Sequence, residues 1–188
     1  EFENVALYCK VGGVPSPSVH WLKNGKRIVQ VEELNGFGDD KLSMYDTGAT
    51  LFIDCLDETD QANYTCVAET PKHRESRSIF LTVLTTVVLS LPGRPARIYM
   101  GTNSVLELEN NSVRLFCRAQ GNPAPSITWY DRDNQVIQDG GHYRLSKSGD
   151  LIIKNISWFD HMGVYTCEAK NDYGADTSSP FLYPTARE

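Results

Sequence analysis

The sequence predicts an all-β protein made of two tandem β-sandwiches. Two observations carry this prediction: five residues recur with identical spacing, and apolar residues alternate with polar ones at period two within each copy. The offset of 108 residues is too long for a solenoid repeat, so each half is expected to have its own core. The first set is Cys9, Gly13, Pro15, Pro17 and Trp21, and the second is Cys117, Gly121, Pro123, Pro125 and Trp129.

The alternation indicates antiparallel strands that are buried on one face. In each copy, strands before and after the Gly-Pro turn are followed by two apolar residues and then by a Tyr-Thr-Cys sequence. The apolar positions are Val5, Leu7, Cys9, Val19, Trp21, Leu51 and Ile53 in the first copy, and Val113, Leu115, Cys117, Ile127, Trp129, Leu151 and Ile153 in the second.

This spacing resembles the immunoglobulin sandwich. A tryptophan follows the first cysteine by 12 residues, and a Tyr-x-Cys sequence ends 45 or 38 residues later. Residues 60–66 match the corner motif of intermediate-set (I-set) immunoglobulin domains, whereas the second copy has His161 where an aspartate is usual. The resemblance implies disulfides Cys9–Cys66 and Cys117–Cys167, around which the core residues Trp21, Tyr64, Trp129 and Tyr165 pack.

The predicted domains are residues 1–88 and 95–188, with a junction at 89–94. Only eight residues precede Cys9, whereas Cys117 lies 22 residues after Pro95. The first domain is therefore expected to lack its first strand, which would lie upstream of Glu1.

Composition excludes some classes of partner. The net charge of -6 and the scattered basic residues disfavour nucleic acid. The most apolar stretch, Ile79 to Leu91, has 13 residues and falls short of the roughly 20 that span a bilayer. We therefore expect no membrane span in this segment.

Three Asn-x-Ser/Thr sequons occur, at Asn63, Asn110 and Asn155. Glycosylation at these positions, together with two disulfides, indicates a secreted, extracellular protein. Intracellular muscle immunoglobulin domains are the alternative.

Cys55 is left without a partner by this pairing. It is either an unpaired, partly buried thiol near a strand end, or it bridges to an upstream segment or to another chain.

No catalytic motif is recognisable, and we expect neither enzyme activity nor a cofactor. The four histidines have no spacing that would gather a metal. The basic group of Lys72, His73, Arg74 and Arg77 is either a solvated hairpin tip or a site for heparan sulfate or an acidic partner.

The stretch from Ile79 to Leu91 runs without a turn residue from the last strand of the first domain into the junction. Such β-branched composition predicts one long strand, which either pairs with the other domain or lies open as a docking edge. The predicted ligand-binding residues are Val87, Val88, Leu89, Leu91, Ile98 and Tyr99.

From Pro95 to the end, the chain is similar to a group of secreted two-immunoglobulin-domain proteins. The group comprises the insect neural/ectodermal development factors, which bind insulin peptides, and the nematode zwei-Ig-domain proteins. The resemblance rests on residues 95–99, 105–108, 126–129, 149–153, 162–165 and 181–184.

This resemblance implies a protein that sequesters or carries an insulin-like or insulin-like-growth-factor peptide, with a role in the nervous system. The alternative is an ectodomain for neuronal adhesion, axon guidance or axon maintenance, whose partner is a cell-surface immunoglobulin-superfamily protein. A homodimer is compatible with either function.

Overall fold

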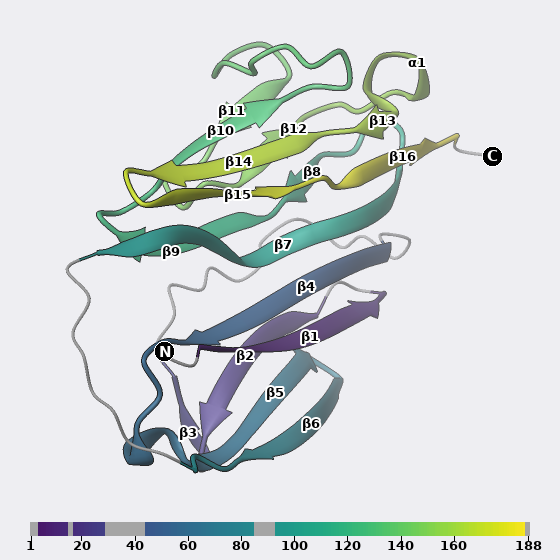
Figure 1. Ribbon diagram of the computed structural model, residues 1–188. Coiled ribbons are helices and arrows are strands. Elements are labelled where there is room, and N and C mark those ends of the chain that lie inside the picture. The colour runs from purple at the N-terminus through teal and green to yellow at the C-terminus, as the bar shows by residue number, and fades with distance from the viewer. Residues whose placement is uncertain (1–3, 15–16, 29–43, 85–92, 187–188) are drawn as a thin grey trace.

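The computed structural model describes residues 4–14, 17–28, 44–84 and 93–186, and the backbone alone at Met44 and Tyr45. Strands β1 to β6 form a first sandwich and β7 to β16 a second (Figure 1). The first contains β1 Val5–Gly13, β2 Ser18–Lys23, β3 Lys26–Arg27, β4 Met44–Ile53, the 3₁₀ turn Glu58–Asp60, β5 Ala62–Thr70 and β6 His73–Leu81. The predicted all-β fold is confirmed.

Apart from the long strand β7, the second sandwich has mostly short strands, and it has one helical turn. It contains β7 Arg94–Leu108, β8 Val113–Leu115, β9 Cys117–Asn122, β10 Ser126–Tyr130, β11 Tyr143–Leu145, β12 Leu151–Ile153, α1 Trp158–His161, β13 Gly163–Val164, β14 Thr166–Asn171, β15 Gly174–Ser178 and β16 Phe181–Thr185.

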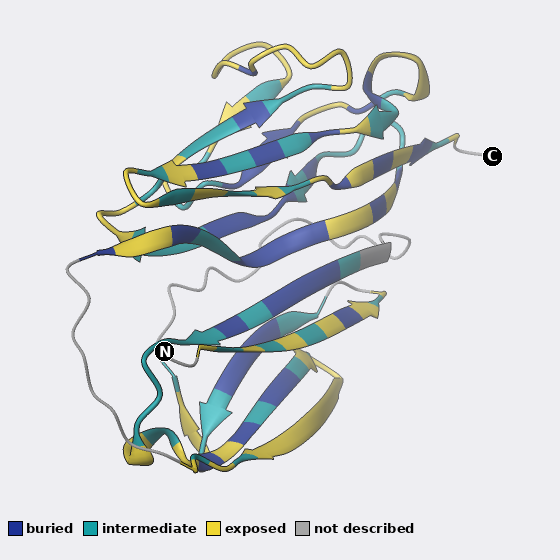
Figure 2. Cartoon of the chain, in the orientation of Figure 1, coloured by how far each residue is buried: buried dark blue, intermediate teal, exposed yellow. Residues whose placement is uncertain are grey.

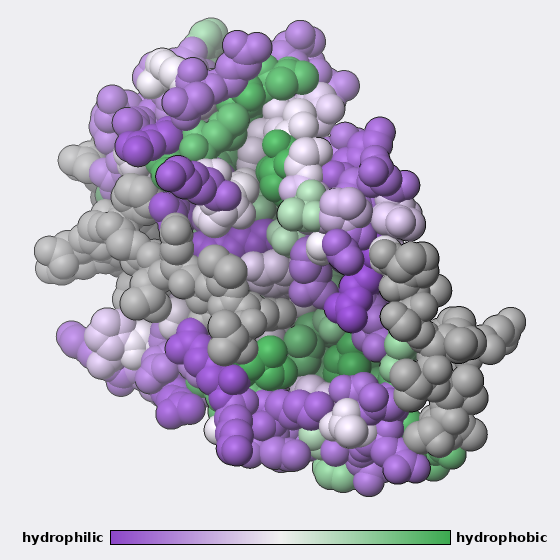
Figure 3. Space-filling model, turned by 90° about the vertical axis from the view of Figure 1, so that its left-hand side faces the viewer, coloured by the Kyte–Doolittle hydropathy of each residue, from purple (hydrophilic) through white to green (hydrophobic). Residues whose placement is uncertain are grey.

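Each sandwich has its own core, as the repeat predicts. The alternation of β1 appears as a regular change between exposed and more buried positions (Figure 2). Seen from the side in Figure 3, apolar residues gather in two areas, one on each sandwich, with hydrophilic residues between them. The first core includes Val19, Trp21, Leu51, Tyr64 and Cys66, and the second includes Leu115, Cys117, Trp129, Ile153, Tyr165 and Leu182.

One sheet crosses both sandwiches, and its strand order is β1-β4-β7-β16-β13. Strand β4 of the first sandwich pairs antiparallel with β7, the first strand of the second (Figure 1). The first half of β7 pairs with β9 and its last residues pair in parallel with β16. Strand β7 therefore closes the second sandwich and also attaches the first one to it.

Side chains lock this junction. Phe52 of β4 packs against a buried cluster of the second sandwich formed by Tyr99, Met100 and Phe116. The guanidinium of Arg97 forms an ion pair with Asp54 and lies 4.5 Å from the centre of the Phe52 ring. The two sandwiches are thus joined by backbone pairing, apolar packing and an ion pair.

The predicted long strand from Ile79 is wrong in its described part, because β6 ends at Leu81 and residues 82–84 are not in a strand. Residues 85–92 lie outside the described residues. The first sandwich is joined to the second by β4 instead, which pairs with β7 along one edge.

Candidate protein-binding surface

The two predicted disulfides, Cys9–Cys66 and Cys117–Cys167, are present. Trp21, Tyr64, Trp129 and Tyr165 are all buried in the cores beside them. The hydroxyl of Tyr64 donates to the Asp60 carbonyl at 2.9 Å, and that of Tyr165 donates to the His161 carbonyl at 3.1 Å. Both sandwiches therefore have the tyrosine corner that the Tyr-x-Cys sequence indicates.

The two corners differ in charge. In the first, Lys23 Nζ lies 3.4 Å from Asp60 Oδ1. In the second, the residue at the corresponding place is His161, and Arg132 donates to the carbonyls of Phe159 and Met162 instead. The corner of the second sandwich thus holds its arginine with backbone oxygens rather than with a carboxylate.

The sequon asparagines Asn63, Asn110 and Asn155 all have exposed side chains. Cys55 is half-buried just after β4, where its backbone has φ +53°, and its N–H donates to Asn4 Oδ1 at 3.1 Å. It is a free cysteine, and the described part of the chain brings no second thiol to it.

The predicted ligand-binding residues fall into two groups. Val87, Val88, Leu89 and Leu91 lie outside the described residues. Ile98 packs against the core of the second sandwich, and Tyr99 is buried in the junction. The structure thus places Ile98 and Tyr99 in packing contacts rather than on an exposed surface.

A different surface is built by the sheet that crosses both sandwiches. One row of paired residues, Gly12, Asp46, Ser104, Phe181 and Val164, runs across all five strands. Residues directly opposite each other in paired strands point to the same side of a sheet. The alternate positions, such as Val11, Val105 and Leu182, are buried in the two cores. One side of this sheet therefore covers both cores, and the other side is open along this row, whereas further along β4 Phe52 is packed against the second sandwich.

We call the open side the outer sheet face. It is rich in aromatic and apolar side chains: Tyr183 is 39% exposed, its strand neighbour Phe181 is 38% exposed, and Trp158 of α1 is 45% exposed. The Trp158 ring centre lies 4.9 Å from that of Tyr183 in an edge-to-face arrangement. The outer sheet face is defined by Tyr8, Lys10, Asp46, Leu106, Val164, Phe181 and Tyr183, together with Trp158.

The part of the face near the first sandwich is polar. Lys10 Nζ lies 2.9 Å from Asp46 Oδ2, and the Asn103 amide donates to Asp46 Oδ1 at 3.3 Å and to the Tyr8 hydroxyl at 3.4 Å. Asn103 belongs to β7, so this network spans the seam between the sandwiches. The face as a whole combines an aromatic area with a charged, hydrogen-bonded one.

Sequence reasoning missed this face for two reasons. Phe181, Leu182 and Tyr183 are all apolar, so their alternation between exposed and buried positions leaves no pattern in the sequence. The pairing of β4 with β7 is not signalled by any local motif. The exposure of Phe181 and Tyr183 is the signal that only the structure supplies.

The described residues contain no group of His, Cys, Asp and Glu side chains that could hold a metal ion. No helix among them is long and apolar enough to cross a membrane. The arrangement that the structure does offer is an open, partly aromatic face suited to contact with another protein.

The immunoglobulin I-set domain model matches residues 1–83 and 99–183. The chain belongs to the immunoglobulin I-set family. Its relatives include the Zwei Ig domain protein zig-2 of Caenorhabditis elegans, 33% identical over 97% of this chain and 79% of that protein. Mouse neural cell adhesion molecule 1 is 32% identical over 96% of this chain but only 16% of its own length.

Among solved structures, this I-set pair is similar to the neural ectodermal development factor IMP-L2. The likeness covers 100% of this chain and 89% of that one, with a TM-score of 0.82 and 27% identity. A score of this size over the whole chain requires that the two sandwiches are placed relative to each other in the same way. The likeness therefore includes the region in which the two sandwiches share a sheet, and not only the fold of each sandwich.

Proposed function

We propose that the protein is a secreted binding protein that holds an insulin-like peptide on its outer sheet face. The observation that carries the proposal is the exposed group of Trp158, Phe181 and Tyr183 on a sheet shared by two locked sandwiches. Aromatic residues dominate the binding energy of protein interfaces when they are surrounded by polar ones. The whole-chain likeness to IMP-L2, and the insulin-like ligands that the sequence resemblance implies, supply the class of partner.

The rigidity of the junction supports this function. Binding costs free energy when flexible parts must be ordered, and a face preformed across two domains avoids that cost. The ion pair of Arg97 with Asp54 and the packing of Phe52 hold the face in one shape.

Secretion is supported by the two disulfides and by the exposure of all three sequon asparagines. Expression in a eukaryotic secretory host should give protein in the medium that loses mass on treatment with an N-glycosidase. Protein that stays in the cell with reduced cysteines would contradict secretion.

Calorimetric titration with insulin-like and insulin-like-growth-factor peptides tests the function. The double variant Phe181→Asp with Tyr183→Asp should weaken binding by about 100-fold, as expected when central aromatic contacts are lost. Phe80→Asp is the matched control, because Phe80 is an exposed aromatic residue on β6, outside the outer sheet face. Val88→Asp with Leu89→Asp tests the junction residues predicted from sequence.

Adhesion or axon guidance is the second candidate, favoured by the likeness to neural cell adhesion molecule 1 and to the Zwei Ig domain proteins. The absence of heat with every insulin-like peptide, combined with binding to a cell-surface immunoglobulin-superfamily ectodomain, would favour this candidate.

A further inference from the structure

The aromatic end of the outer sheet face depends on a helix of a single turn. Trp158, whose ring lies edge-to-face against Tyr183, is the first residue of α1, and α1 lies beside β16 (Figure 1). A helix this short does not hold its own shape, because one turn fixes several residues for very few hydrogen bonds. The position of Trp158 is therefore set by the bonds that close the turn.

Ser157 and His161 close the turn through two reciprocal hydrogen bonds. The backbone N–H of His161 donates to the Ser157 carbonyl at 3.0 Å, and the backbone N–H of Ser157 donates to His161 Nδ1 at 3.0 Å. A ring nitrogen accepts a hydrogen bond only while it carries no proton, so this ring is neutral, with its proton on Nε2. The second of the two bonds exists only in that state.

The surroundings of the His161 ring disfavour a positive charge. Only 3% of the residue is exposed. The ring centre of His142 lies 5.0 Å away and that of Tyr143 lies 6.2 Å away, while the guanidinium of Arg132 is held at the same corner by two backbone carbonyls. Burial above all lowers the pKa of His161, and the two basic neighbours lower it further.

The remaining groups around the ring offer a second proton no free place. The Asp160 carboxylate favours the charged ring, but it already accepts the Ser157 hydroxyl at 2.8 Å. The Tyr165 hydroxyl donates to the His161 carbonyl and not to the ring. A proton on Nδ1 could be donated to Ser157 Oγ, 3.4 Å away, but that oxygen already accepts the Asp160 N–H as the N-cap of α1. Protonation would therefore disturb both ends of the turn.

We propose that His161 is a positioning residue that couples the outer sheet face to pH, so that the face releases its ligand on acidification. Protonation removes the acceptor of the Ser157 N–H and loosens α1. The Trp158 N–H keeps its own acceptor, Glu109 Oε1 at 2.7 Å, so the indole tilts away from Tyr183 while the backbone stays attached.

The direction of the effect follows from linkage. The loosened turn exposes the ring, so it binds the proton more tightly than the closed turn does, and a ligand that needs the closed turn is held less tightly at low pH. Acidification of the kind met in endosomes would free the ligand. The ligand in this inference rests on the function proposed above, whereas the movement of Trp158 is measured without any ligand.

Fluorine NMR of the full chain labelled with 5-fluorotryptophan follows this movement directly. The chain has three tryptophans, of which Trp21 and Trp129 are buried in the two cores. The Trp158 resonance is identified by its loss in Trp158→Phe. We expect this resonance to shift between pH 7 and pH 5 at a temperature well below unfolding. The other two should stay in place, which also shows that both sandwiches remain folded.

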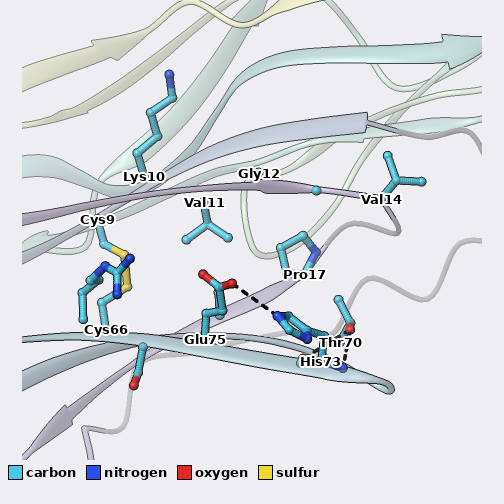
Figure 4. A pocket seen from close by; sticks show the side chains of 14 residues that line it. Cys9, Lys10, Val11, Gly12, Val14, Pro17, Cys66, Thr70, His73 and Glu75 are labelled. Carbon is cyan, nitrogen blue, oxygen red and sulfur yellow. Dashed lines mark hydrogen bonds and ion pairs between the residues drawn. A yellow bond between two sulfur atoms is a disulfide. The ribbon is translucent and has the colours of Figure 1, made fainter.

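His161→Asn is the decisive variant. The Asn side chain offers an oxygen near the place of Nδ1 and does not titrate, so α1 keeps its bond to Ser157 at both pH values. We expect the Trp158 resonance of this variant to be the same at pH 7 and pH 5. His73→Asn is the matched control, because His73 is an exposed histidine of the first sandwich whose ring pairs with Glu75 at 3.2 Å (Figure 4). It should keep the shift of the unchanged chain.

Calorimetric titration with an insulin-like peptide at the two pH values extends the test to the ligand. The unchanged chain should bind about tenfold more weakly at pH 5 than at pH 7, as expected when release takes up one proton. His161→Asn should lose this tenfold change and His73→Asn should keep it. The groups of the peptide itself titrate equally in all three experiments, so they do not affect the comparison.

Two results would overturn the proposal. One is a Trp158 resonance that stays unchanged between pH 7 and pH 5, or that shifts equally in His161→Asn. The other is an equal loss of affinity at pH 5 in His161→Asn and in the unchanged chain. If His161→Asn does not fold, nitrogen NMR of the labelled histidine rings in the unchanged chain decides, because Nδ1 of His161 must gain its proton over the same pH range in which Trp158 moves. The absence of heat with every peptide at pH 7 would contradict the proposed function, and the Trp158 resonance would still decide the coupling to pH.

Discussion

Each sandwich has its own tyrosine corner, and His161 gives the corner of the second one a different physical chemistry. Its carbonyl accepts the tyrosine hydroxyl, as that of Asp60 does in the first sandwich. The ring is buried, and its Nδ1 accepts the backbone N–H of Ser157 at 3.0 Å. Burial lowers the pKa of His161 below its usual value, and the nearby His142 and Arg132 lower it further, while Asp160 acts in the opposite direction.

The second sandwich should therefore lose stability as the pH falls. A histidine whose pKa is lowered by folding binds fewer protons in the folded than in the unfolded state, so its contribution is present above pH 6.5 and is lost below it. We expect the melting temperature of the second sandwich to fall between pH 7 and pH 5. His161→Gln should flatten this dependence, while His73→Gln, on the exposed β6, should not; a steep dependence retained in His161→Gln would assign it to other groups.

At the scale of the element, β4 and β7 are the strands that make one body from two sandwiches. Phe52 lies on the outside of the first sandwich, so its contacts with Met100 and Phe116 serve the junction rather than a core. The pairing of β4 with β7 continues beyond these contacts as far as Leu106.

Phe52→Asp should loosen the junction while both sandwiches stay folded. The change places a carboxylate beside Asp54 and in an apolar cluster, which is unfavourable for packing. Small-angle X-ray scattering should show a larger radius of gyration and a broader distance distribution. Phe159→Asp is the control because Phe159 is 83% exposed. A scattering curve identical to that of the unchanged protein would show that backbone pairing alone holds the junction.

For the whole molecule, stability depends on two disulfides in two cores that share a sheet. The disulfide of the first sandwich closes a loop of 57 residues and that of the second a loop of 50. Loops of this length correspond to about 4 kcal/mol of stabilisation each in the chain-entropy model, which is a large part of the stability of a small domain.

Replacing Cys9 and Cys66 together by Ala should lower the free energy of unfolding of the first sandwich by about 4 kcal/mol. Because unfolding of β4 would uncover β7, this variant should also aggregate more readily. Urea denaturation and light scattering measure the two effects. Cys55→Ala removes a free thiol instead and should change both little; a large effect of Cys55→Ala would show that the thiol has a structural role.

The sequence was sufficient to predict the fold and the core of each sandwich. The spacing of Cys9, Trp21 and Cys66 and its repetition predict the disulfides, the buried aromatic residues and the fold class, because these features are local to a repeated unit. The contacts between the sandwiches were not predicted, because the sequence pointed to the strand from Ile79 as the element of the junction, whereas β4 pairs with β7. The pairing of β4 with β7 depends on which edges remain free after each sandwich has formed, and the burial of Tyr99 depends on Phe52 from the other sandwich.

The sheet shared by the two sandwiches also limits how this protein can be recombined with others. Domains joined by a flexible linker can be cut apart and inserted elsewhere, because each is complete. Here, a gene fragment that encoded only one sandwich would yield a protein in which the paired part of β4 or of β7 is uncovered. The two sandwiches together are therefore the smallest unit that could be moved into another protein without uncovering a strand edge. Duplication of both sandwiches together is the simplest route to a longer protein.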